Sequence, residues 1–257
     1  MKQLSILCIA LFMLSCNQEK QKSATEPAKT EKPATNDMMV LLVNYELENM
    51  SLEDHAALGT AVGPNFAPAN IEGLIGKTFI GNVDTGVFGG LYYFKNNTSL
   101  DNYLNSELFK GIMAHPNLVN FNNTSYGVAP ISAVTNGIAD NRKTSSDPTA
   151  AAEMRVLLVN YKLKDMNLEA HAALGTAVAP NFTPANIEGL IGKTFIGNVE
   201  TGVFGGVYYF QTQEVLDNYL NSELYKGITV HPNLVHFTTR QFMVASVSAV
   251  TNGIPVL

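Results

Sequence analysis

One stretch of this chain occurs twice, and that repeat limits what the chain can fold into. Residues 73–94 read GLIGKTFIGNVDTGVFGGLYYF, and residues 189–210 repeat these letters except that Asp84 becomes Glu200 and Leu91 becomes Val207. Such self-similarity indicates that one structural unit was duplicated. The chain has 257 residues, so the repeat predicts two similar domains in place of one large one.

Each copy of the stretch has the pattern of a β-hairpin. Apolar and β-branched residues run to Asn82, the triplet Asp84-Thr85-Gly86 supplies turn residues, and a second strand begins at Val87. The adjacent Gly89 and Gly90 interrupt that strand, which predicts a bulge, a bend or the close approach of another group.

The flanking segments complete an alternating order of strands and helices. Strands are expected at 39–45, 118–121 and 128–134, and helices after the caps Ser51 and Asn167 and over 99–111. The order strand, helix, strand, strand, helix, strand is typical of a ferredoxin-like unit. Because helices cover one face of such a sheet while its strands are apolar on both, we expect an α+β fold in which two βαββαβ units pair sheet to sheet, with a cavity between the sheets.

The first residues have the pattern of a secretory signal. Lys2 precedes the apolar run Leu4 to Leu14, and Ser15-Cys16 resembles the cleavage region of a bacterial lipoprotein, in which Cys16 is lipidated. An ordinary cleavage site is the alternative. We expect a protein of the bacterial cell envelope, facing the periplasm or cell surface and held to the membrane only by lipid.

The boundaries expected from composition follow from this reading. A signal peptide at 1–16 and a disordered tether at 17–37 precede repeat 1 at 38–138, a linker at 139–153 and repeat 2 at 154–257. Cys8 leaves with the signal, so the mature fold has no thiol for catalysis or metal binding.

Charge and motif spacing exclude some classes of function. The net charge is −6 with no basic cluster in the folded part, so nucleic acid is not an expected partner. No cluster has metal-ligand spacing: Glu53-Asp54-His55 loses its central carboxylate in the second copy, where Ala170 replaces Asp54. We therefore expect no metal site.

Several motifs together resemble the YdhR-type monooxygenases of the dimeric α/β-barrel superfamily. The resemblance covers nearly all of each repeat and rests on the following residues: Gly73-Leu74-Ile75, Lys77, Thr85-Gly86, Gly89-Gly90, Tyr92, Phe94, Tyr103-Leu104, His115-Pro116 and Ser132-Ala133-Val134-Thr135. It implies an intramolecular dimeric α/β barrel. Related oxygenases often work without metal or flavin, so the resemblance implies no cofactor.

Haem-degrading members of that superfamily offer a further comparison. They resemble this chain in having an asparagine near the end of the first strand, here Asn44 and Asn160. Their tryptophan is replaced by Tyr103 and Tyr219, and their haem-binding histidine by Met113 and Thr229. The resemblance therefore does not extend to haem degradation by their route.

The candidate catalytic residues are polar groups within apolar patterns. His55 and His171 are candidate general bases, while Lys77, Lys193, Asn44 and Asn160 are candidates to stabilise a substrate anion. The alternatives are a core or interface histidine, a lysine that reaches solvent, and an asparagine that satisfies a turn. Aromatic residues would contact the substrate or simply form core: Tyr45, Tyr161, Phe79, Phe195, Tyr93, Tyr209, Tyr103 and Tyr219.

These observations favour a lipid-anchored, cofactor-independent monooxygenase that acts on a small aromatic or polycyclic compound. One alternative is a non-catalytic module that binds a hydrophobic small molecule at the membrane, and another is a domain for protein association. The intramolecular pseudo-dimer leaves further homo-oligomerisation open.

Overall fold

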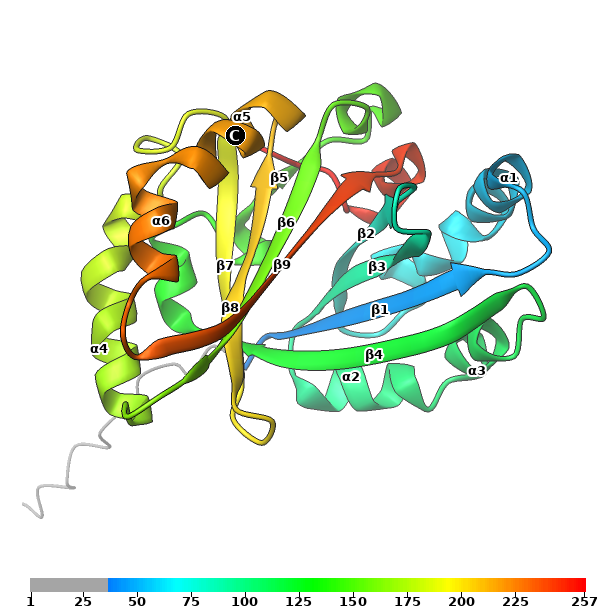
Figure 1. The fold of residues 1–257 in the computed structure, drawn as a ribbon. Helices are drawn as coiled ribbons and strands as arrows, with labels where there is room; N and C mark the ends of the chain where they lie inside the picture. Colours follow the sequence, from blue (N-terminus) through cyan, green and yellow to red (C-terminus); the bar gives the residue numbers. More distant parts are fainter. Residues whose placement is uncertain (1–36) are drawn as a thin grey trace, which may run out of the picture. The chain divides into compact units, whose positions relative to one another are not determined.

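The computed structural model describes residues 37–257 (Figure 1). The signal, Cys16 and almost all of the predicted tether lie outside the described residues. Repeat 1 contains β1 (Met39–Leu47), α1 (Leu52–Val62), β2 (Leu74–Asn82), β3 (Val87–Phe94), α2 (Asn97–Leu104), α3 (Glu107–Met113) and β4 (Leu118–Val128). Repeat 2 contains β6 (Arg155–Leu163), α4 (Leu168–Val178), β7 (Leu190–Asn198), β8 (Val203–Phe210), α5 (Gln213–Asn221), α6 (Glu223–Thr229) and β9 (Leu234–Val244).

The two four-stranded sheets close into one barrel, which confirms the predicted α+β fold of paired ferredoxin-like units. The strand order is β1-β3-β2-β9-β6-β8-β7-β4. The repeats join through short antiparallel pairings at both seams, where Ile80 pairs with Val244 and Val128 with Ile196. The covalent chain thus forms the closed barrel by itself.

Alternation along each strand separates two apolar layers. In β1, Val40 and Leu42 face the barrel interior, while Leu41 and Val43 face the helices of repeat 1. Side chains from both sheets fill the interior as one cluster. Large side chains therefore occupy much of the space between the sheets, where the sequence predicts a cavity. The candidate catalytic residues His55 and Lys77 line a different cavity, on the face of the repeat 1 sheet that the helices cover.

Two predicted elements differ from the structure. The helix expected over 99–111 is divided into α2 and α3, because Ser106 caps a new helix by accepting a hydrogen bond from the Phe109 N–H. The last strand runs unbroken over Leu118–Val128, and the extended segment expected at 128–134 instead becomes the 3₁₀ turn η3 (Pro130–Ala133). Proline at the start of η3 fits a helical turn and offers no N–H for a strand.

Each repeat sends its C-terminal segment onto the other repeat. The turn η7 (Ser246–Thr251) lies on β2, where the Phe79 N–H donates to Ser248 Oγ and the Ala245 N–H donates to the Phe79 carbonyl. Similarly, η3 lies on β7, with Ser132 and Phe195 making the equivalent contact. These crossings place residues of each repeat on the sheet of the other repeat.

The linker is part of the packed structure. It contains η4 (Ala139–Asn141), the short strand β5 (Lys143–Thr144) and η5 (Pro148–Ala151), and β5 pairs with β10 (Pro255–Val256). Ala151 is fully buried, and the Arg142 guanidinium lies between the Tyr93 and Tyr209 rings, 4.8 and 5.0 Å from their centres. Since there is a single linker, it breaks the two-fold similarity of the repeats.

Candidate active site

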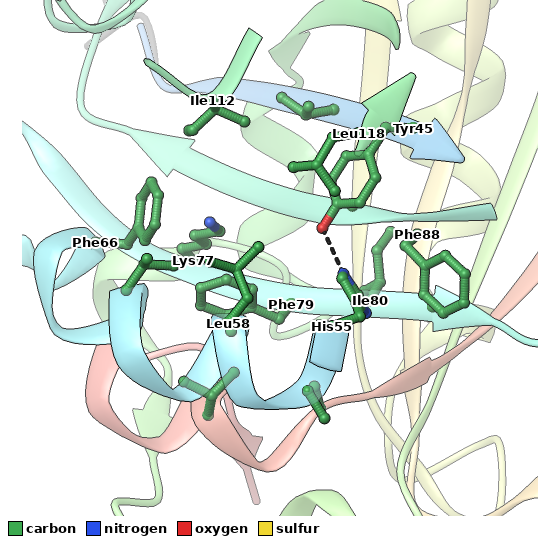
Figure 2. A pocket seen from close by; sticks show the side chains of 18 of the residues that line it. Tyr45, His55, Leu58, Phe66, Lys77, Phe79, Ile80, Phe88, Ile112 and Leu118 are labelled. Carbon is green, nitrogen blue, oxygen red and sulfur yellow. Dashed lines mark hydrogen bonds between the residues drawn. The ribbon is translucent and has the colours of Figure 1, made fainter. Parts of the chain in front are cut away.

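An apolar cavity of about 570 Å³ lies between α1, α3 and the outer face of the repeat 1 sheet (Figure 2). The helix α1 has no buried residue, although its His55, Ala56 and Gly59 line the cavity. The cavity separates α1 from the sheet, so the apolar face of α1 lines the cavity and does not pack on the strands. Residues 243–247, from repeat 2, complete the wall.

Lys77 lies on the wall of this cavity within three aromatic rings. Its Nζ is 3.3 Å from the centre of the Phe66 ring, 3.7 Å from that of Phe79 and 4.6 Å from that of Tyr92. The residue is 4% exposed. Within residues 37–257, its Nζ makes no hydrogen bond or ion pair. Aromatic faces attract the cation, but they cannot replace the hydration of an ammonium group.

The register of β2 directs Lys77 to this face. Its neighbour Thr78 points the other way, where its hydroxyl donates to the Gly253 carbonyl at 2.7 Å and lies 2.9 Å from the Tyr209 hydroxyl. The Lys77 carbonyl accepts a hydrogen bond from the Thr251 hydroxyl. Repeat 2 therefore fixes the backbone from which the lysine side chain projects.

Tyr45 and His55 form a hydrogen-bonded pair at the same cavity. The Tyr45 hydroxyl lies 3.0 Å from His55 Nε2, and Figure 2 shows this contact beside Phe88. The His55 ring also packs on Phe88 with 4.7 Å between ring centres. These contacts hold the imidazole at the cavity wall and orient it through one ring nitrogen.

Burial sets the protonation of all three groups. It lowers the pKa of the His55 imidazole and lowers that of the Lys77 ammonium well below its usual range, while it raises the pKa of Tyr45 to about 12. At neutral pH, His55 is therefore a neutral base and Tyr45 keeps its proton. An anion beside Lys77 would favour the charged form of the amine again.

Repeat 2 reproduces these contacts. Lys193 Nζ lies 3.3, 3.8 and 4.8 Å from the ring centres of Phe182, Phe195 and Tyr208. The Tyr161 hydroxyl lies 2.9 Å from His171 Nε2. Burial shifts the pKa values of Tyr161, His171 and Lys193 in the same directions as in repeat 1.

The structure brings together only part of the predicted site. Tyr45, His55, Lys77 and Phe79 line the cavity of repeat 1. Their copies in repeat 2 make the matching contacts among themselves: Tyr161, His171, Lys193 and Phe195.

The predicted asparagines lie elsewhere. Strand alternation turns Asn44 and Asn160 away from the helices, toward the barrel interior. Asn160 Nδ2 donates to the Tyr126 hydroxyl at 3.3 Å, whereas the Asn44 amide has no hydrogen-bond partner among the described residues. Neither asparagine lines the cavity that contains Lys77.

Four predicted aromatic contacts also lie away from the cavity. Tyr93 and Tyr209 belong to the interior cluster beside Arg142. Tyr103 packs on Tyr92 with ring centres 5.2 Å apart, as part of the core beneath α2, and Tyr219 occupies the same place beneath α5. These tyrosines are core residues, the alternative left open by the sequence.

Sequence reasoning missed two parts of the wall. His115, named above only for the family resemblance, lines the cavity while its Nδ1 accepts a hydrogen bond from the Asn117 N–H. The segment 243–247 gave no local signal, because its role depends on the packing of one repeat against the other.

The described part of the chain has neither a metal-binding cluster nor a membrane-spanning helix. Between residues 37 and 257, no group of three or more His, Cys, Asp or Glu is arranged to hold a metal ion. No helix in this range is long and apolar enough to cross a membrane.

Comparisons with known proteins agree with this fold. The model of the family described as "Putative mono-oxygenase ydhR" matches residues 40–138 and again 156–254. No curated protein matches the chain.

Solved structures show the same fold at low sequence identity. A "Putative monooxygenase" from Fusobacterium nucleatum has a TM-score of 0.59 at 11% identity, covering 81% of this chain and 92% of its own. A "putative monooxygenase" from Lactobacillus acidophilus has 0.57 at 12%, covering 86% and 99%. An "anthrone oxidase-like protein" has 0.52 at 12%, covering 81% and 92%.

Proposed function

The chain belongs to the YdhR mono-oxygenase family, and on that premise we propose that it oxidises a small aromatic or polycyclic compound with dioxygen and without a cofactor. One observation carries the proposal: Lys77 and the Tyr45–His55 pair line the same apolar cavity. A neutral base and a buried amine in one apolar cavity favour the formation of a substrate anion.

The proposed reaction begins with proton transfer. The neutral His55 imidazole removes a proton from a phenolic hydroxyl or an acidic C–H group of the substrate, and Tyr45 keeps the imidazole oriented. Lys77 then stabilises the anion, whose charge favours the ammonium form. The aromatic side chains hold the ring of the substrate.

The anion itself supplies electrons to dioxygen. At an activated CH₂ group, as in an anthrone, one oxygen atom becomes the product carbonyl. The other leaves as water with the two hydrogens of that carbon. The substrate is oxidised and dioxygen is reduced, so no further reductant is needed. The name of the anthrone oxidase-like relative supports this choice of substrate class.

Oxygen consumption with anthrones, quinols and phenols tests the proposal. We expect uptake that depends on the protein, with one atom of isotopically labelled dioxygen in the product. The double variant His55→Gln/His171→Gln should lose it, whereas Lys110→Ala, at an exposed lysine, should keep it. Tight binding without uptake would contradict the enzyme and favour a binding module.

We also propose that lipid on Cys16 anchors the protein at the cell envelope. The sequence Leu14-Ser15-Cys16 after an apolar run supports this. A Cys16→Ser variant should move from the membrane fraction to the soluble fraction of a bacterial host. Unchanged fractionation would contradict the anchor.

A further inference from the structure

Lys77 differs from the lysines that stabilise the surface of this protein. Lys110 and Lys226 pair with glutamates one helical turn away, with side chains 58% and 57% exposed. Lys77 is buried among rings and faces no carboxylate within hydrogen-bonding distance in the described part of the chain. An unpaired buried amine is costly to keep for packing alone, since methionine would fill similar space.

Burial favours the form of this amine that reacts with electrophiles. Burial lowers the pKa of the Lys77 ammonium well below its usual range, which increases the fraction with a free lone pair at neutral pH. Desolvation of a lysine in an apolar pocket is one established route to a nucleophilic amine. The Lys110 ammonium lies 2.7 Å from Glu107, on the exposed surface.

The cavity gives this amine access to a hydrophobic ligand. Lys77 is one of its lining residues, and Figure 2 shows it between Phe66 and Phe79 in the cavity that the Tyr45–His55 pair also lines. Rings around the Nζ would pack on a planar ligand. The polar pair supplies a hydroxyl and an imidazole for proton transfers at the same cavity.

We propose that Lys77 captures hydrophobic aldehydes or ketones as imines. The Nζ lone pair forms a bond to the carbonyl carbon, giving a carbinolamine. Its C–O bond then breaks, and the oxygen leaves as water with two protons originally on the amine. The C=N bond forms without oxidation or reduction. Tyr45 and His55 relay these protons. The capture needs no dioxygen and does not depend on the proposed oxygenase reaction.

Reductive trapping tests the capture within a single sample. The protein is incubated at pH 7 without oxygen, with 1-naphthaldehyde and cyanoborohydride, and the modified lysines are identified by peptide mass mapping. We expect Lys77 to be labelled at least about tenfold faster than the exposed Lys110, since one unit of pKa changes the free-amine fraction about tenfold. Naphthalene, which lacks a carbonyl, should compete at Lys77 and not at Lys110.

Two controls keep the proposal open to refutation. Lys77→Met should lose that label and keep the label on Lys110. The main comparison, between Lys77 and Lys110, is made within the wild-type protein, so it does not depend on how well the variant folds. Formaldehyde replaces naphthaldehyde in a second series. Labelling confined to exposed lysines with both aldehydes would overturn the capture, and labelling of Lys77 by formaldehyde alone would overturn its preference for hydrophobic carbonyls.

Discussion

The two repeats have the same buried side-chain contacts but different rims. A rim here means the residues that the other repeat places beside those contacts, such as 243–247 at the repeat 1 cavity. The distances from Lys77 Nζ to the Phe66 and Phe79 rings are 3.3 and 3.7 Å, and the matching distances from Lys193 are 3.3 and 3.8 Å. The Tyr–His pairs also match, at 3.0 and 2.9 Å. Duplication thus preserved these side-chain contacts within each repeat.

The rims differ because each is supplied by the other repeat. At one seam Gly81 of β2 pairs with Met243, while at the other Gly197 of β7 pairs with Gly127. A Cβ atom added to Gly63 would clash with Cγ2 of Val247. At the matching position, repeat 2 has Ala179, which already carries a Cβ. The residues beside the two clusters therefore differ, although the clusters themselves match.

The largest effect should come from removing one base at a time. His55→Gln should lower turnover at the first site by about 10²- to 10⁴-fold, the usual contribution of a general base, and His171→Gln should do so at the second. Oxygen uptake over a series of substrates of increasing size checks this. If the rims select ligands, the two variants will lose activity toward different substrates. A loss of about half the oxygen uptake with every substrate, in both variants, would contradict selection by the rims.

Gly89→Ala and Gly205→Ala should destabilise the fold about equally. In each case a Cβ would meet the carbonyl oxygen of the neighbouring strand, at Val43 or Val159, and the φ angle of Gly89 is 158°. A backbone clash inside a sheet places each substitution among strongly destabilising changes, about 3 kcal/mol or more. Urea denaturation measures both. A mild effect in only one variant would show that the barrel halves are not equivalent.

The buried lysines should make stability rise with pH. The folded-state pKa of Lys77 and Lys193 lies below the unfolded value, so the unfolded chain binds more protons between the two values and stability increases with pH across that window. Each lysine contributes up to about 1.4 kcal/mol per pH unit there. Urea denaturation between about pH 7.5 and 9.5 measures this slope. The range lies below the usual pKa of tyrosine, so tyrosine ionisation contributes little.

Variants separate the two contributions. Lys77→Met and Lys193→Met should each remove a similar part of the slope and raise stability at the low end of the range. Lys110→Met, at an exposed lysine, is the control for the change of residue type. A slope that persists in the double variant Lys77→Met/Lys193→Met would mean that these amines do not titrate as their burial implies.

The smallest effect concerns the rim alone. Gly63→Ala should cost about 1–2 kcal/mol through overpacking against Val247, while Ala179→Gly should cost about 0.5–1 kcal/mol through backbone entropy. Thermal unfolding measures both. Combining Gly63→Ala with Val247→Ala should restore stability, and failure to do so would place the strain elsewhere.

Local patterns predicted much of the fold because they act over a few residues. Ser51 and Asn167 cap α1 and α4 as expected, since each side chain accepts a hydrogen bond from a backbone N–H three residues later. The break at Ser106 was missed, because its capping role competes with an apolar period that continues through it.

The candidate site was predicted less completely. Residue type alone selected Lys77 and His55, which line one cavity. It also selected Asn44, whose side chain faces the opposite side of the sheet. Strand alternation shows that these side chains lie on opposite faces of the sheet only when the register of β1 against β2 and β3 is known.

The sequence by itself determined that two similar ferredoxin-like units exist, because repetition and periodicity are written in the order of residues. Only the tertiary structure decided where the cavity lies and which residues close it. Which face a helix leaves open, and which distant segment covers a rim, depend on how the sheets meet and on the path of the single linker. Those are properties of contacts between residues far apart in the chain, and no local pattern records them.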